Sequence, residues 1–428
     1  MKLYNIKKSV IGHNVKVSIA IDSKELGKRE LWFSAPQKYE YGICENQYDA
    51  YLVGLLYPAM RCGEDIHIEG RVSKRLLFNI NHYAIPLIKS FSPSCKNIKV
   101  TATELTNLNY NGDGVGTVFS GGIDSFCTIY DHLGLENDPD YRINSFLFLN
   151  VGAHGSKSED KVRRKFETRY NYLKRFPEEV GLDFIPVDSN LHDFHPWGHQ
   201  LTCTLTLASG AMFMQKFYNK YYCASLGWSY LEILEHYKTD LDKDIAMFDP
   251  MLLPLLSTES LELISDGNQY TRTEKTLRII DYGPVKKYLN VCVSGDDTHE
   301  NCSVCSKCSR TLMTLNSLDR LEEFNHLFDI EKYKKEAEKK YVRKQVALQN
   351  VDPFAKGNVE LAKYNNIKLP NRLWCLIVWS PNILKQKMIT KLKDVLPENA
   401  INKLSKISCQ GKQKFSSAKD EYSESTRI

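Results

Sequence analysis

The stretch SGGIDS (residues 120–125) decides the fold, because it joins two segments of different periodicity. Before it, VGTVFS (115–120) is a short apolar run typical of a buried strand. After it, DSFCTIYDHLG (124–134) has the apolar spacing of a helix. A loop between a strand and a helix lies at the carboxyl end of a parallel strand, where α/β proteins bind ligands. The sequence therefore predicts an α/β fold with a ligand site in this loop.

The residue types in the loop suit a bound phosphate. Gly121 and Gly122 let the backbone approach an oxyanion and turn its N–H groups inward. The helix that starts at Asp124 or Ser125 adds the positive end of its dipole. The hydroxyls of Ser120 and Ser125 can donate to phosphate oxygens, and Asp124 can cap the helix or face Mg²⁺. We therefore predict a nucleotide-binding loop made of Ser120, Gly121, Gly122, Ile123, Asp124 and Ser125.

Two other phosphate-binding motifs are absent from this region. A Walker A loop places a lysine directly after its last glycine, and no lysine follows Gly122. A dinucleotide fingerprint reads G-x-G-x-x-G after a strand. Here Gly112, Gly114 and Gly116 are spaced G-x-G-x-G and precede the strand.

Strand and helix patterns alternate from residue 109 to about 320. Further apolar runs at 145–150, 183–188 and 221–227 predict three more strands, separated by helical patterns at 158–176 and 200–219. Continuous apolar strands that alternate with helices predict a parallel sheet with helices on both faces.

The regions on either side of this core have other patterns. Residues 1–108 contain four β-rich runs and one helical segment, and predict an N-terminal α+β domain that could dock a partner protein. The turn-rich NYNGDGVG (109–116) marks its boundary. Residues 321–408 predict a mainly helical region in which 368–380 is buried, and the polar residues 409–428 predict a disordered tail.

Composition narrows the class of protein. The 428 residues are 42% hydrophobic and 25% charged, which is typical of a soluble globular protein. A net charge of +5 over this length gives no argument for nucleic-acid binding, which stays open. The N-terminus MKLYNIKKSVIGHN lacks the apolar core of a signal peptide, and no apolar run is long enough to span a membrane. We therefore expect a cytoplasmic protein with no membrane contact.

Four of the 12 cysteines form a cluster with the spacing of a metal site. Cys292, Cys302, Cys305 and Cys308 follow the pattern C-x9-C-x2-C-x2-C, which is typical of a tetrahedral zinc site. Four protein ligands leave no open position, so the predicted Zn²⁺ is structural rather than catalytic. An iron–sulfur cluster is the alternative.

The SGGxDS loop resembles the PP-loop of ATP pyrophosphatases, whose fold is adenine nucleotide alpha-hydrolase-like. That family includes GMP synthetase, NAD synthetase, asparagine synthetase, tRNA thiolation enzymes and 7-cyano-7-deazaguanine synthase. The resemblance implies ATP and Mg²⁺ as ligands and cleavage of ATP between its α- and β-phosphates. AMP would be transferred to an oxygen of the substrate, and a nucleophile would then displace it.

The order of the loop and the cysteine cluster resembles 7-cyano-7-deazaguanine synthase more closely. NVGAHG (150–155) stands where the synthase has D-Y-G-Q-R-H, which implies that Gly152 and His154 contribute to the nucleotide site. The segments 249–276 and 289–315 resemble a QueC-like family of larger proteins, the antiphage-defence type that includes QatC. The resemblance covers about 110–320. It implies a 7-deazaguanine substrate, or a macromolecule modified with it, and a partner protein from the same gene cassette.

The segment TRTEK (271–275) supplies further candidate residues. A cation beside the leaving pyrophosphate would stabilise developing charge, so Lys275 and Arg272 join Asp124 and Ser125 as candidate catalytic residues. The alternative is a solvated charged helix face. Glu259 and Asp188 are weaker candidates for holding substrate or magnesium, with helix capping as the alternative for Glu259.

Other features leave the function open. His192, His195 and His199 could form a metal group or a substrate-facing loop, and Cys127 could be a thiol nucleophile or a core residue. The Y-x-D-C-R substrate segment of the synthase is absent, since GWSYLEILEHYKTD (227–240) stands in its place. Two alternatives to the QueC-like ligase therefore remain, namely a nucleotide-sensing subunit of a multiprotein complex and a tRNA-thiolation enzyme.

Overall fold

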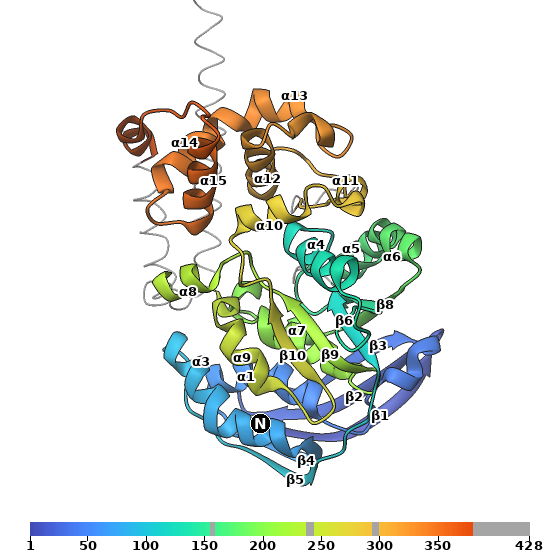
Figure 1. Ribbon diagram of the computed structural model, residues 1–428. Helices are drawn as coiled ribbons and strands as arrows, with labels where there is room; N and C mark the ends of the chain where they lie inside the picture. The colour runs from blue at the N-terminus through green and yellow to red at the C-terminus, as the bar shows by residue number, and fades with distance from the viewer. Residues whose placement is uncertain (155–158, 237–243, 293–298, 380–428) are drawn as a thin grey trace, which may run out of the picture.

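A computed structural model describes residues 1–154, 159–236, 244–292 and 299–379. Within these residues a single ten-stranded sheet forms the centre of the molecule (Figure 1). Its strands are β1 (Lys2–Ile11), β2 (Asn14–Ser23), β3 (Gly27–Pro36), β4 (Ile66–Ser73), β5 (Val100–Thr106), β6 (Gly114–Val118), β7 (Ser145–Asn150), β8 (Asp183–Ser189), β9 (Tyr218–Ala224) and β10 (Glu262–Asp266). The strand order is β10-β9-β6-β7-β8-β3-β2-β1-β4-β5.

Helices pack around this sheet (Figure 1). They are α1 (Asp49–Cys62), α2 (Lys74–Asn79), α3 (Ile85–Phe91), α4 (Ile123–Ile129), α5 (Glu159–Leu173), α6 (Arg175–Val180), α7 (Cys203–Phe213), α8 (Tyr230–His236), α9 (Asp249–Leu256), α10 (Arg272–Ile279), α11 (Gly283–Tyr288), α12 (Ser306–Ser317), α13 (Ile330–Lys332), α14 (Lys339–Leu348) and α15 (Pro353–Tyr364). Of these, α12 to α15 form a separate helical layer beyond α10 (Figure 1).

The half of the sheet from β10 to β8 is parallel, and it confirms the predicted α/β class. All six residues of β7 are buried, because helices cover both faces of the strand. Phe146 and Phe148 belong to the core cluster that includes residues of α4, α5 and α6. Leu147 and Leu149 belong to the cluster that includes α1, α7 and α9. Alternate side chains of one strand thus enter two separate cores.

The N-terminal strands continue this sheet. β1, β2 and β3 form an antiparallel meander, and β4 and β5 extend it in parallel. β3 pairs antiparallel with β8 through Phe33 with Ser189 and Ser34 with Asp188. The backbone hydrogen bonds therefore cross the predicted boundary at 108/109, and one core cluster holds residues from both sides of it. β1 was not among the predicted strands, because its residues are mostly exposed and polar.

The helices α12 to α15 confirm a helical C-terminal region. The expectation that residues 368–380 are buried is wrong for most of the described part of that segment. Leu373 and Ile377 are 68% and 65% exposed, whereas Cys375 is buried against Val346 and Val359. The predicted disordered tail at 409–428 lies outside the described residues. No helix in the described ranges has the length and apolar character needed to cross a membrane.

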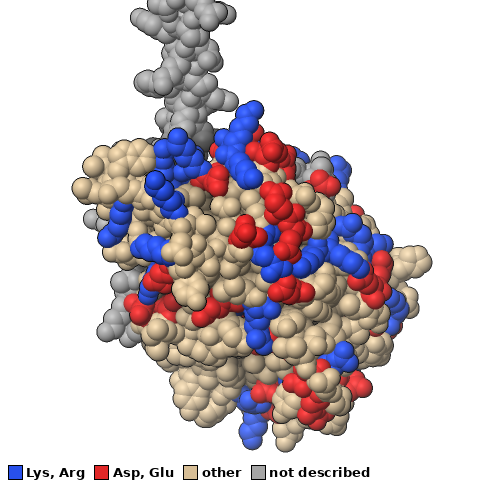
Figure 2. Space-filling view, turned by 45° about the horizontal axis from the view of Figure 1, so that its top comes forward, with Lys and Arg blue, Asp and Glu red and all other residues tan. Residues whose placement is uncertain are grey.

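Charged side chains of both signs share the face drawn in Figure 2. Lysines and arginines lie beside aspartates and glutamates there rather than in one basic patch. This face therefore lacks the concentrated positive charge that nucleic-acid binding usually needs.

Candidate anion-binding site

The SGGIDS loop forms a closed turn between β6 and α4. The hydroxyl of Ser125 donates to the Val118 carbonyl at 3.1 Å and accepts from the Ser120 amide at 3.2 Å. Ser125 is buried, so in this conformation its hydroxyl braces the loop. Ser120 is exposed and its hydroxyl accepts from the Gly122 amide at 3.5 Å. The two predicted serines therefore occupy different environments, one inside the turn and one at its surface.

Gly121 is required by the backbone and by its surroundings. Its φ of +77° lies in the left-handed region, which side chains rarely adopt. A Cβ at this position would lie 2.9 Å from the Leu173 side chain and 3.2 Å from Cβ of Asn290. Gly122 caps α4, whose first residue is Ile123. The loop thus packs directly against α5 and against the segment that precedes Cys292.

Asp124, Arg272 and Lys275 meet beside this loop, although they lie on α4 and α10. A carboxylate oxygen of Asp124 is 2.7 Å from Nη2 of Arg272, and the other is 3.4 Å from Nζ of Lys275. Burial raises the pKa of Asp124, but Arg272 and Lys275 outweigh burial and hold that pKa below its usual value. The carboxylate is therefore ionised at neutral pH.

Lys275 is a buried cation with a full set of partners. Its side chain is 0% exposed, and Nζ donates to Ser225 Oγ at 2.7 Å and to the Ser225 carbonyl at 3.2 Å. Thr271 and Glu274 form a capping box that fixes the start of α10, so Glu274 is a capping residue. The alternative of a solvated charged helix face is wrong for Lys275, because its ammonium points into the protein.

Three further cations surround the loop, and the sequence analysis did not single them out. Arg169 of α5 donates through Nη2 to the Ser120 carbonyl at 3.1 Å. Lys307 and Arg310 lie on α12, in the CSKCSR run (305–310) that contains the third and fourth cysteines of the cluster. The guanidinium groups of Arg310 and Arg272 lie over the ring of Phe354, at 3.8 and 5.6 Å from its centroid. Lys307 and Arg310 could have been identified from the sequence by their position inside the cysteine motif.

The charges of these residues act on one another. Lys307 is exposed at the start of α12, where the positive charges of Arg272, Arg310 and Arg169 and the negative charge of Asp124 act on it. Three cationic side chains therefore act on the carboxylate of Asp124, namely Arg272, Lys275 and Lys307, and Arg169 and Arg310 complete a cluster of five cations in the described residues. Like charges held this close raise the free energy of the folded chain, and a polyanion would relieve that repulsion.

Gly152 and His154 lie at the edge of this cationic cluster, after β7. Gly152 has a φ of +128°, and a Cβ there would lie 3.2 Å from Nδ1 of His199. The ring of His154 packs edge-on against Phe148 and Phe166. Burial and the charge of Arg169 lower the pKa of His154 to about 3, so the imidazole is neutral at physiological pH. Its Nδ1 is buried without a hydrogen-bond partner.

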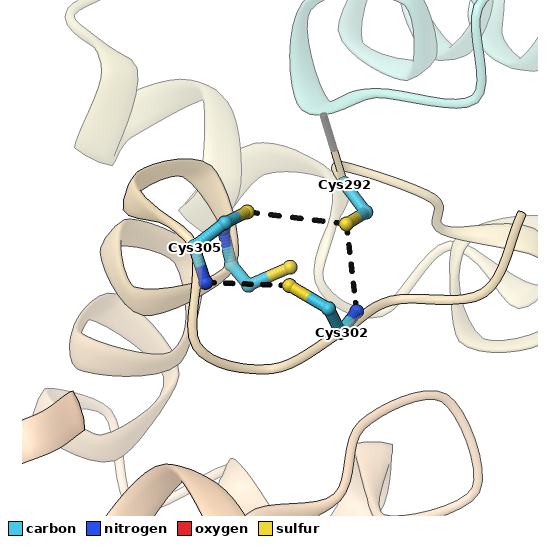
Figure 3. A group of neighbouring side chains, drawn as sticks. Cys292, Cys302 and Cys305 are labelled. Atoms are coloured by element: carbon cyan, nitrogen blue, oxygen red, sulfur yellow. Dashed lines mark hydrogen bonds between the residues drawn. The ribbon is translucent and has the colours of Figure 1, made fainter. Parts of the chain in front are cut away.

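The four cysteines come together, as their spacing predicted (Figure 3). Their sulfur atoms all lie within 4.8 Å of one another, and Sγ of Cys292 is 3.9 Å from Sγ of Cys305. Two thiolates on a tetrahedral zinc with bonds of about 2.3 Å would be about 3.8 Å apart. Amides of Cys302 and Cys305 point at the sulfurs of Cys292 and Cys302, at 3.5 and 3.3 Å.

These separations fit a single metal ion such as zinc. The thiolates of an iron–sulfur cluster surround several iron atoms and would be spread farther apart than the edges of one tetrahedron. The distances between the sulfur atoms therefore disfavour the iron–sulfur cluster. With four protein ligands the site has no open position, so its metal would stabilise the fold.

No known protein family, no curated protein and no solved structure matches this chain. The interpretation of the site therefore depends on the residues and distances given above.

The remaining sequence candidates do not form a second site. His195 is buried, and its Nε2 lies 2.8 Å from the Gly54 carbonyl. Among the described residues the four cysteines are the only group of three or more His, Cys, Asp or Glu that could hold a metal, so the histidine metal group is not formed. Glu259 accepts from Ser73 Oγ at 2.6 Å and from the Arg75 amide at 2.9 Å, so it caps α2.

Asp188 keeps a place near the carboxyl ends of the strands, whereas Cys127 loses its proposed role as a nucleophile. Asp188 accepts from Asn150 Nδ2 at 2.6 Å and pairs with Arg163 at 3.1 Å, at the ends of β7 and β8. Cys127 is 0% exposed in the core beside α4. Burial and the charge of Asp131 raise the pKa of the Cys127 thiol to about 12, so it is not a nucleophile at neutral pH.

Proposed function

We propose that this chain is a QueC-like PP-loop ATP pyrophosphatase that transfers AMP to a substrate. The observation that carries the proposal is the meeting of Asp124, Arg272 and Lys275 beside the SGGIDS loop, at the carboxyl end of β6. Residues from two helices that are far apart in sequence converge on the one turn that the sequence predicts to bind phosphate.

The proposed transfer of AMP requires positive charge around the leaving pyrophosphate. An oxygen of the substrate attacks the α-phosphorus of ATP, the bond to the β-phosphate oxygen breaks, and substrate-AMP and pyrophosphate result. Backbone amides of residues 121–125 and the cations Arg169 and Lys307 would bind the pyrophosphate. Arg272 and Lys275 would stabilise the charge that develops on it. Asp124 is the carboxylate that could face Mg²⁺, which supplies further charge neutralisation to the phosphates.

The acceptor is proposed from the resemblance rather than from the site. It would be a 7-deazaguanine or a macromolecule modified with it, and a second nucleophile would replace AMP. The same resemblance supports a role in antiphage defence in the cytoplasm with a partner protein. Structural zinc would hold the segments that carry Lys307 and Arg310, as the distances between the sulfurs allow.

A second candidate is a nucleotide-sensing subunit, and one observation favours it. Where the synthase has its substrate segment, this chain has α8, whose Leu231 and Leu234 are 65% and 69% exposed. The preceding Leu226 carbonyl accepts from Nη2 of Arg272 at 3.1 Å, so this apolar surface adjoins the cationic cluster. A protein partner could bind there and respond to the nucleotide. The tRNA-thiolation alternative is disfavoured, because Cys127 is buried and protonated.

The deciding experiment measures AMP and pyrophosphate release from α-labelled ATP by the zinc-loaded protein with Mg²⁺. It is run with and without 7-carboxy-7-deazaguanine and ammonia. Asp124→Ala removes the carboxylate of the site, and Asp22→Ala, near the end of β2 with a side chain that is 46% exposed, is the control. AMP release that is lost only in Asp124→Ala supports the pyrophosphatase. Tight ATP binding without AMP release under every condition overturns the enzyme and favours the sensing subunit.

A further inference from the structure

One buried asparagine joins the four-cysteine site to the SGGIDS loop. Asn290 is 1% exposed and stands two residues before Cys292. Its backbone amide donates to the Gly121 carbonyl at 2.7 Å. Its Oδ1 accepts from Arg169 Nη2 at 3.2 Å, and its Nδ2 donates to the His299 carbonyl at 2.6 Å. A single residue thus contacts the loop, a cation of the site and the segment that leads into Cys302.

The other cysteine segment reaches the same site from a different side. Cys305 caps α12, since its sulfur accepts from the Cys308 amide at 3.5 Å. Lys307 lies in the first turn of this helix, and Arg310 in the second. Arg310 shares the Phe354 ring with Arg272, which itself holds Asp124. The start of α12 therefore sets where two of the five cations lie.

A metal bound by four thiolates would fix these two segments relative to each other. Cys292 belongs to the segment after Asn290, whereas Cys302 and Cys305 belong to the turn before α12 and Cys308 to its first turn. A closed tetrahedral site holds its ligands at set distances, and much of its binding free energy appears as folding free energy. Without the metal, hydrogen bonds through Asn290 and Asn301 would still join these segments in the described residues, but they would not hold the four sulfurs at set distances.

We propose that the four-cysteine site positions the anion site, with Asn290 as the positioning residue for Gly121 and Arg169 and with Lys307 and Arg310 as polyphosphate-binding residues. Metal occupancy then raises the affinity for polyphosphate. This inference rests on the proposed function, because it takes the anion to be the triphosphate of ATP or its pyrophosphate product.

The test measures the dissociation constants of inorganic pyrophosphate, ATP and AMP by calorimetry, with the full chain. Lys307→Gln and Arg310→Gln should each weaken pyrophosphate and ATP binding by about tenfold, because each removes a charge-assisted contact. AMP binding should change little, since AMP lacks the phosphates that these side chains would hold. Lys332→Gln, an exposed lysine of α13, is the control.

Asn290→Ala is the decisive variant, because it keeps the backbone amide and the cysteines. We expect it to weaken pyrophosphate binding by about fivefold or more while the metal content per chain stays at the wild-type value. Asn81→Ala removes a comparable set of amide hydrogen bonds in the N-terminal region and should change neither quantity. Metal-stripped protein that stays folded by circular dichroism should bind pyrophosphate more weakly than metal-loaded protein.

The outcomes separate this inference from the proposed function. Wild-type protein that binds neither ATP nor pyrophosphate overturns the proposed function and the inference together. Wild-type protein that binds both, with unchanged pyrophosphate affinity in Asn290→Ala, Lys307→Gln and Arg310→Gln, overturns the inference alone. If metal removal unfolds the chain, the three metal-loaded variants still decide the question.

Discussion

The carboxylate of Asp124 lies 2.7 Å from the guanidinium of Arg272, although α4 and α10 are separated by most of the parallel sheet in sequence. Lys275, one helical turn after Arg272, contacts the other oxygen of the same carboxylate, 151 residues away along the chain. Buried charges cost free energy unless they are paired, and here two cations share one carboxylate, while Arg169 lies 3.1 Å from the Ser120 carbonyl of the same loop. This imbalance is the physical basis for expecting an anionic ligand.

The role of Lys275 can be separated from its contribution to stability. Lys275→Met keeps the volume but removes the ammonium, so AMP release should fall by about 100-fold or more. The free energy of unfolding should fall by about 2–4 kcal/mol, because Asp124 loses one of its two cations but keeps its ion pair with Arg272 at 2.7 Å. AMP release and urea unfolding are the two measurements, with Lys332→Met as the control. Wild-type activity in Lys275→Met would contradict the assigned role.

Asp249 gives a prediction about pH. It is buried, and its carboxylate accepts from Thr204 Oγ1 at 2.5 Å. Burial and the charge of Asp244 raise the pKa of Asp249 to about 8. In the unfolded chain an aspartate has a pKa of about 3.9, so between about pH 4 and pH 8 only the unfolded chain gives up this proton. Stability is therefore lost as pH rises through this window.

Asp249→Asn removes that titration. We expect the variant to gain stability relative to wild type as pH rises from 5 to 8, by about 1–3 kcal/mol over the window. Urea unfolding at several pH values measures the difference. Asp22→Asn, at an exposed aspartate, should show no such trend. A constant difference between Asp249→Asn and wild type across the window would show that Asp249 is ionised in the folded protein.

The cysteine site makes a prediction about metal identity and stability. Cys305→Ser should lose most of the bound metal, and its melting temperature should fall by about 5 °C or more, because metal binding is coupled to folding. Elemental analysis of wild type should find zinc. Cys62→Ser, outside the cluster, should keep the wild-type metal content. Iron with sulfide and visible absorption in the wild-type protein would instead establish an iron–sulfur cluster.

Cys127 distinguishes the thiolation alternative from the proposed reaction. Because its thiol is buried and protonated, Cys127→Ala should keep AMP release within about twofold of wild type. The lost core packing should cost about 1–2 kcal/mol of unfolding free energy. Wild-type Cys127 should also resist alkylation under native conditions. Loss of substrate turnover in a stable Cys127→Ala protein would instead support the thiolation mechanism.

The seam between β3 and β8 predicts how the N-terminal strands unfold. Asn190 accepts from the Trp32 amide at 2.9 Å and donates to the Glu30 carbonyl at 2.9 Å. Asn190→Ala should therefore cost about 1–3 kcal/mol, whereas Asn325→Ala, at an exposed position, should cost less than about 0.5 kcal/mol. We expect one cooperative transition in both, because a single core cluster spans the seam. Two separate transitions in wild type would show that residues 1–108 fold independently.

Local patterns were sufficient for most of the parallel core. The apolar run of β7, the turn chemistry of Gly121 and Gly122, and the cysteine spacing each have a physical cause within a few residues, so they can be recognised without contacts. The errors arose where a segment's environment decides its burial. Residues 368–380 were expected to be buried because they are apolar and aromatic, but in the described part neighbouring helices cover only the side of Cys375.

The sequence by itself determined the α/β class, the strand–loop–helix turn at residues 120–125 and the cluster of four cysteines, because glycine conformation, strand periodicity and cysteine spacing are local properties of the chain. Only the tertiary structure decided that β3 joins β8, that Lys275 points inward to Asp124, and that Asn290 lies between the loop and the cysteines. These relationships are contacts between distant segments. Their free energy depends on burial and on the charges that packing brings together, which no stretch of sequence contains alone.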